Sequence, residues 1–187
     1  NYSSNNDSEQ AIYSDLERII TKIKPINNIL SISWLFDDHL PRLPTKTDGE
    51  NLSELINKAR IESIKNYVLN SSIKNLINLA KKVKYPELLS RTIGKCNPSL
   101  EFYKDITTNA VELNDFNSFK FEIFYGAYQL YGHSWFNWSE MKYLKKEFDE
   151  KYFSIILHSL PDKLETWKKV ELYGKSIDHE YWKNKIV

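Results

Sequence analysis

The sequence is poor in residues on which several kinds of site depend. It has one cysteine, Cys96, so no disulfide can form within the chain and no thiolate cluster can bind a metal. Its five glycines form no phosphate-binding loop: Gly94-Lys95 precedes Cys96 instead of Ser or Thr, and Leu89 occupies the first glycine's position. No apolar run approaches the roughly 20 residues of a membrane-spanning helix. We therefore expect a cytoplasmic protein without a cofactor or a membrane partner.

Histidine is equally sparse, which limits the candidate metal sites to one. No two of the four histidines are three or four residues apart, and His179-Glu180 is followed by Lys183 where a zinc-protease helix has its second histidine. The remaining cluster is Asp37-Asp38-His39, whose carboxylates and imidazole could ligate a cation or share a proton. A solvated helix end has the same composition, and we favour that interpretation.

What the sequence does contain is enough apolar material for a large core. Apolar residues make up 41% of the 187 residues and aromatic residues 14%, and each buried ring removes a large area from water. We expect residues 8–187 to form one domain, preceded by a flexible arm of residues 1–7. A sub-boundary near 96–114 is an alternative division.

Apolar residues recur at helical spacing along nearly the whole chain, and no segment alternates as a strand does. The pattern therefore predicts an all-α fold of eight to ten helices in antiparallel hairpins, arranged either as an α-solenoid or as an irregular bundle. The expected helices span about 8–24, 26–36, 52–69, 73–83, 86–94, 98–111, 115–131, 134–148, 162–173 and 177–186.

The helix expected at 115–131 has aromatic residues all round, which indicates burial on every side. The aromatic group after it, Tyr131, Trp135, Phe136 and Trp138, could line a ligand groove. Aromatic residues at this spacing more often form core, and we expect core.

Charge is unevenly distributed although the net charge is only +1. Residues 58–95 hold nine basic and two acidic side chains. If consecutive helices present their polar faces to the same side, these cations form one surface for a phosphate backbone or an acidic partner protein. A merely solvated face is the simpler reading. The candidate binding residues are Lys58, Lys65, Lys74, Lys81, Lys82, Lys84 and Arg91.

The C-terminal stretch Leu160-Pro161, Trp167, Val170, Gly174 and Tyr181-Trp182 resembles a helical hairpin from α-solenoid regions, HEAT- or TPR-like, of large multidomain proteins. The segment 34–38, Trp-Leu-Phe-Asp-Asp, is similar in character. This resemblance implies a module that scaffolds or recognises partners and carries no catalytic residues.

Together these observations favour a non-catalytic interaction or scaffold domain that recognises another protein, or another domain of the same chain, through a surface including 58–95. The sequence does not begin with methionine, which favours a fragment of a larger protein or a processed chain. Two alternatives stay open. One is a nucleic-acid-binding protein that contacts phosphates, and the other is a metal-dependent hydrolase that uses Asp37, Asp38 and His39.

Overall fold

The computed structural model describes residues 29–37, 52–68, 71–113 and 116–185. Within these ranges every regular element is helical, with nine α-helices, which confirms the predicted all-α fold. Two short 3₁₀-helices (η1, η3) and one π-helical turn (η2) accompany them. The elements are η1 (Ile29–Phe36), α2 (Leu52–Ser63), η2 (Ile64–Val68), α3 (Ile73–Ala80), α4 (Pro86–Lys95), α5 (Leu100–Asn109), η3 (Ala110–Glu112), α6 (Asn117–Tyr131), α7 (His133–Leu144), α8 (Glu150–His158), α9 (Leu164–Leu172) and α10 (Lys175–Lys185).

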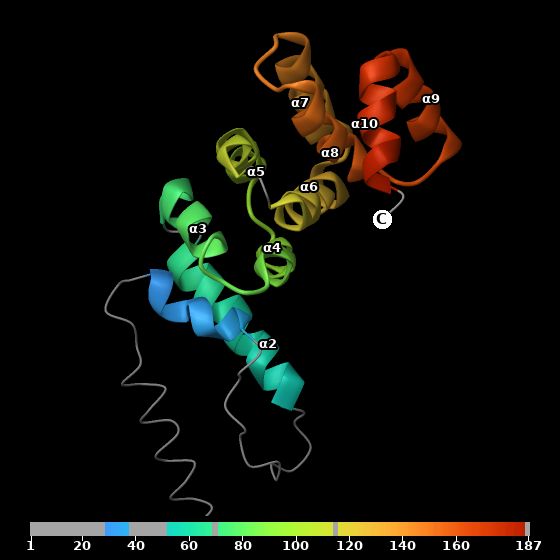
Figure 1. Cartoon of the computed structure of the whole chain (residues 1–187). Coiled ribbons are helices and arrows are strands. Elements are labelled where there is room, and N and C mark those ends of the chain that lie inside the picture. The colour runs from blue at the N-terminus through green and yellow to red at the C-terminus, as the bar shows by residue number, and fades with distance from the viewer. Residues whose placement is uncertain (1–28, 38–51, 69–70, 114–115, 186–187) are drawn as a thin grey trace, which may run out of the picture.

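The helices follow one another along the molecule, from α2 at one end to α9 and α10 at the other (Figure 1). From α2 to α8, each helix except α7 packs on the helix two places later. One layer contains α2, α4, α6, α8 and α10, and a second contains α3, α5 and α7. Contacts of α5 with α6, of α6 with α7 and of α7 with α8 join the two layers. The expected arm 1–7 and the expected helix 8–24 lie outside the described residues.

The core is rich in aromatic rings and is centred on α6. Phe124 is fully buried between Trp135 of α7 and Tyr152 of α8, at ring-centroid distances of 5.7 and 5.6 Å. The indole N–H of Trp135 and the hydroxyl of Tyr152 both donate to Thr107 of α5, so the polar atoms of these two buried side chains are paired. Phe136 is also buried. The expectation that this aromatic group forms core is confirmed for Trp135 and Phe136, and the partly buried Tyr131 and Trp138 pack against the core.

Several helix ends carry residues that are typical of helix starts and stops. Pro86 is the first residue of α4, where its missing N–H costs nothing. Ser72 caps α3 by accepting the Asn75 amide. Gly132 ends α6 with a φ of +49°, a conformation that favours glycine.

The helix expected over 134–148 ends at Leu144, and α8, which was not among the expected helices, follows it at Glu150–His158. Lys146 has a φ of +61°, which ends the helical path after α7. Asp149 then caps α8, its carboxylate accepting the Tyr152 amide at 2.7 Å. The apolar residues Ile155, Ile156 and Leu157 are buried within α8. Gly132 directly precedes the first residue of α7.

The expectation that the most apolar helix is buried on every side is wrong. On α6, Phe121 is 37% and Tyr125 44% exposed, because the helices packed on α6 leave one face uncovered. Among the described residues, no helix combines the length and apolar character needed to cross a membrane.

Candidate functional site

Of the predicted metal-binding cluster, only Asp37 lies among the described residues; Asp38 and His39 lie outside them. A carboxylate oxygen of Asp37 accepts the backbone N–H of Lys84 at 3.1 Å. The carbonyl of Phe36 accepts the N–H of Tyr85 nearby. Asp37 therefore joins the end of η1 to the connection between α3 and α4. The described part of the chain contains no group of three or more His, Cys, Asp or Glu side chains that could hold a metal ion.

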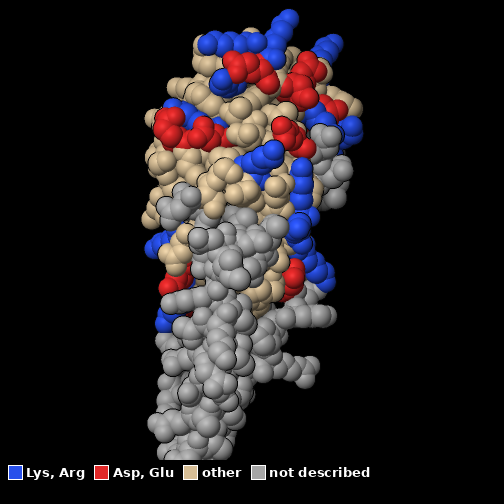
Figure 2. All heavy atoms as spheres, turned by 90° about the vertical axis from the view of Figure 1, so that its left-hand side faces the viewer, with Lys and Arg blue, Asp and Glu red and all other residues tan. Residues whose placement is uncertain are grey.

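The predicted basic residues are spread over several elements and are all exposed. Lys58 lies on α2 and Lys65 on η2, while the others belong to α3, to the segment after it, and to α4. Lys74, Lys81 and Lys82 form no ion pair with any residue that the structure describes. On the face shown in Figure 2, the Lys and Arg side chains of the upper part are interspersed with Asp and Glu.

Arg91 is held in a different environment from the lysines. Its guanidinium contacts Glu122 of α6, with one nitrogen 2.6 Å from a carboxylate oxygen and Nε donating to the same oxygen at 2.8 Å. This hydrogen bond and the charge of Glu122 raise the pKa of Arg91 above its ordinary value. The pair joins α4 to α6 at the edge of a hollow in the surface.

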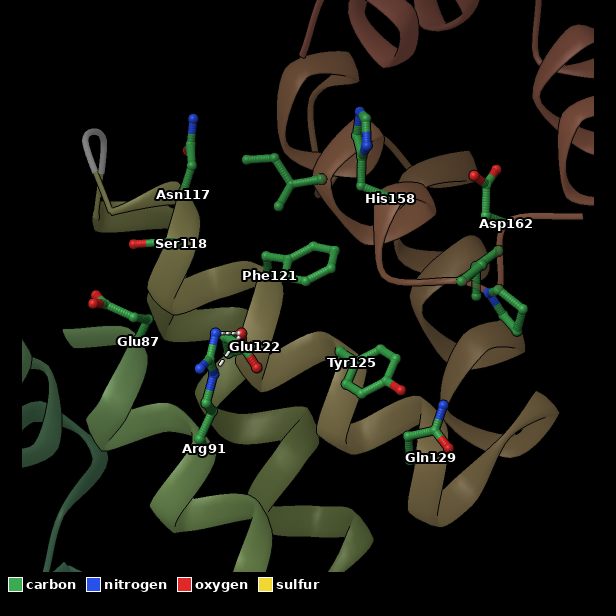
Figure 3. A pocket seen from close by; sticks show the side chains of 13 residues that line it. Glu87, Arg91, Asn117, Ser118, Phe121, Glu122, Tyr125, Gln129, His158 and Asp162 are labelled. Carbon is green, nitrogen blue, oxygen red and sulfur yellow. Dashed lines mark hydrogen bonds and ion pairs between the residues drawn. The ribbon is translucent and has the colours of Figure 1, made fainter. Parts of the chain in front are cut away.

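That hollow is the main candidate site. It is a groove of about 750 Å³ formed by three consecutive helices of one layer, α4, α6 and α8, together with the turn after α8. Figure 3 shows Phe121 and Tyr125 projecting from α6 into it, with Arg91 and Glu87 on one side and His158 and Asp162 on the other. The volume lies in the range of sites that hold small ligands or several side chains.

The walls of the groove are fixed by contacts behind them. The hydroxyl of Ser90 on α4 donates to the carbonyl of Phe119 on α6 at 3.0 Å, in the buried contact between these helices. Across the groove, Asp162 accepts the indole N–H of Trp167 at 2.7 Å, and Thr166 donates to the carbonyl of Pro161. These contacts hold the groove residues in place, so a ligand can bind with little rearrangement of the helices.

Two half-exposed aromatic rings form the floor of the groove. Phe121 and Tyr125 are stacked, with centroids 6.2 Å apart and planes 13° from parallel. His158, at the wall, is itself stacked on Tyr181 at 4.4 Å. Exposed neighbouring rings cost free energy in water, so this pair is a candidate contact surface.

Phe121 and Tyr125 were not among the site residues predicted from the sequence. The signal was present, because aromatic residues at i and i+4 share one face of a helix. It was concealed by the aromatic residues on the other faces of α6, since only the packing of α4 and α8 decides which face stays uncovered.

Comparison of the chain with models of protein families, with curated proteins and with solved structures gave no match.

Proposed function

We propose that this chain is a helical interaction domain that binds a segment of another protein, or of another domain of the same chain, in the groove between α4, α6 and α8. The observation that carries the proposal is the stacked, half-exposed pair Phe121 and Tyr125 on the floor of a groove of about 750 Å³. Large aromatic side chains are the residues most enriched at the centres of protein interfaces.

The layered fold supports this proposal. Helices stacked two places apart form an extended surface from residues of successive helices, as in the α-solenoid regions that the C-terminal sequence resembles. The groove lies on such a surface and uses three members of one layer. The chemistry of the groove is suited to recognition, because two aromatic rings, two side-chain amides and charged groups line it.

A random-peptide library displayed on phage tests this function. We expect selection on the purified protein to enrich sequences that bind the wild type and do not bind the Tyr125→Ser variant. Leu130→Ser is the matched control, because Leu130 lies on the same helix, is 43% exposed and does not line the groove. Enrichment only of sequences that bind all three proteins equally would refute the groove as the recognition site.

A second function, the binding of a nucleic-acid backbone, is favoured by one observation. Lys74, Lys81 and Lys82 are exposed on or just after α3, a helix whose opposite face is buried, and form no ion pair with the rest of the described chain. Lysines in such a position can neutralise phosphates and release counterions.

Fluorescence anisotropy with mixed-sequence single- and double-stranded oligonucleotides at two salt concentrations tests this second function. The result expected for phosphate binding is micromolar affinity that falls steeply with salt and is lost when Lys74, Lys81 and Lys82 are all changed to Glu. A variant with Glu at Lys151, Lys163 and Lys168, exposed lysines at the other end of the molecule, serves as the charge-matched control. Absence of binding at low salt eliminates this function.

A further inference from the structure

We infer that the occupant of the groove is a basic segment of the partner, whose lysine or arginine side chains lie over the Phe121 and Tyr125 rings with their charged ends among the groove carboxylates. This inference rests on the proposed function and specifies the chemistry of the partner. Three observations carry it: the charge of the lining, the exposed rings, and the order of side chains along α6.

The lining has an excess of negative charge. Glu87, Glu122 and Asp162 contribute three carboxylates, and Arg91 is the one lysine or arginine among the residues that line the groove. Arg91 already contacts Glu122, and its guanidinium also feels the charge of Glu87. A ligand of positive charge therefore gains from the field of the groove, while an acidic ligand is repelled.

The ring faces offer a second attraction for a cation. A Lys or Arg group within about 6 Å of an aromatic centroid is attracted by the ring quadrupole, and its methylene stem covers the apolar edge of the ring. The chain itself contains such a contact, because Lys169 Nζ lies 4.1 Å from the centroid of Phe136. In the groove, Phe121 and Tyr125 expose their rings beside the carboxylates, so one basic side chain can reach both.

The order of side chains along α6 sets the length of the segment. Asn117, Phe121, Tyr125 and Gln129 lie four residues apart on one helix face, and all of them line the groove. Twelve residues of helix rise about 18 Å, which an extended peptide covers with about five or six residues. The amides at the two ends can pair with the peptide backbone, while the rings between them take the side chains.

Three labelled heptapeptides provide the test: one alternating lysine with leucine, one with glutamine at the lysine positions and one with glutamate there. Binding is measured by fluorescence anisotropy on the whole chain. We expect the lysine peptide to bind at least about tenfold more tightly than the glutamine peptide, which corresponds to one good cation contact, and the glutamate peptide to bind least. The affinity for the lysine peptide should fall as salt is added.

Two variants show whether the binding uses the groove. Tyr125→Ser and Glu87→Gln should each lower the affinity for the lysine peptide several-fold. The exposed controls Leu130→Ser and Glu165→Gln should leave this affinity unchanged. Circular dichroism melting of each variant shows that the fold is retained. Equal binding of the three peptides, or an equal loss in the control variants, overturns the inference.

The phage selection separates this inference from the function on which it rests. Selected peptides that need the groove for binding and are rich in lysine and arginine support both the interaction domain and the basic occupant. Groove-dependent sequences that are apolar or acidic leave the interaction domain in place and overturn the basic occupant. Failure to obtain any groove-dependent sequence removes the proposed function itself.

Discussion

Replacing Phe124 by alanine is expected to lower the free energy of unfolding by about 3–5 kcal/mol. The ring is fully buried and packs against Trp135 and Tyr152, which come from the two helices that follow α6. Truncation removes the apolar area of the ring and leaves a cavity that the neighbouring large rings cannot fill without leaving their rotamers. Because three helices meet at this side chain, the structure has little freedom to collapse around the hole.

Urea denaturation followed by circular dichroism measures this loss. Phe121→Ala is the matched control: it removes the same ring from the same helix, but on the exposed face, so we expect a change below about 1 kcal/mol. A loss below about 1 kcal/mol for Phe124→Ala, or equal losses for both variants, would show that the two faces of α6 are wrongly assigned. The comparison therefore also tests whether the groove face is the uncovered one.

The sequence was sufficient to predict the helical class because the apolar spacing is a local property. Ile77 and Ala80 on α3 point inward at helical spacing, and Ser72 and Pro86 mark helix starts that need no distant partner. Periodicity alone could not predict that α7 ends at Leu144 and that α8 follows it at Glu150–His158. The break depends on the positive φ of Lys146, and lysine gives no signal for that conformation.

The candidate site was less predictable because it depends on contacts between distant residues. Arg91 was grouped with the lysines by its place in a basic segment, yet it pairs with Glu122, 31 residues later. Likewise, Phe121 and Phe124 are both phenylalanines of one apolar helix, and only the placement of α4 and α8 makes the first a surface residue and the second a core residue. Composition and periodicity contain no information on the ion pair of Arg91 with Glu122 or on which of the two phenylalanines is buried.

The contact between α4 and α6 makes a second large effect predictable. Gly126 of α6 faces Gly94 of α4, and a Cβ added at Gly126 would lie 3.8 Å from the Cα of Gly94 and 3.1 Å from the hydroxyl oxygen of Tyr103. That hydroxyl is buried and has no hydrogen-bond partner among the described residues. Burial also raises the pKa of Tyr103. The two glycines therefore leave just enough space for this ring end between the helices.

Gly126→Leu is expected to lower the free energy of unfolding by about 2–3 kcal/mol, because its side chain has to displace Tyr103 or separate α4 from α6. Tyr103→Phe should raise stability by about 1 kcal/mol, since it removes an unsatisfied buried hydroxyl. Gly126→Ala tests whether the Tyr103 hydroxyl is the group with which a side chain at position 126 clashes. Alanine favours a helix by about 1 kcal/mol over glycine, so the substitution should become stabilising once the hydroxyl is gone in the Tyr103→Phe background.

Urea denaturation of the wild type, Gly126→Ala, Tyr103→Phe and the double variant measures the coupling free energy between the two positions. Gln129→Leu, on the exposed surface of α6, is the control for the added bulk of Gly126→Leu. If Gly126→Ala has the same effect with and without the Tyr103 hydroxyl, the clash is not with Tyr103, and the contact between α4 and α6 is looser than the distances indicate. If the effect of Gly126→Ala depends on the Tyr103 hydroxyl, the close approach of α4 to α6 at Gly94 and Gly126 is confirmed. Because both helices line the groove, this approach also sets the position of its wall. The separation of Arg91 from Glu122, and with it the shape of the site, then depends on a packing contact on the buried side of these helices.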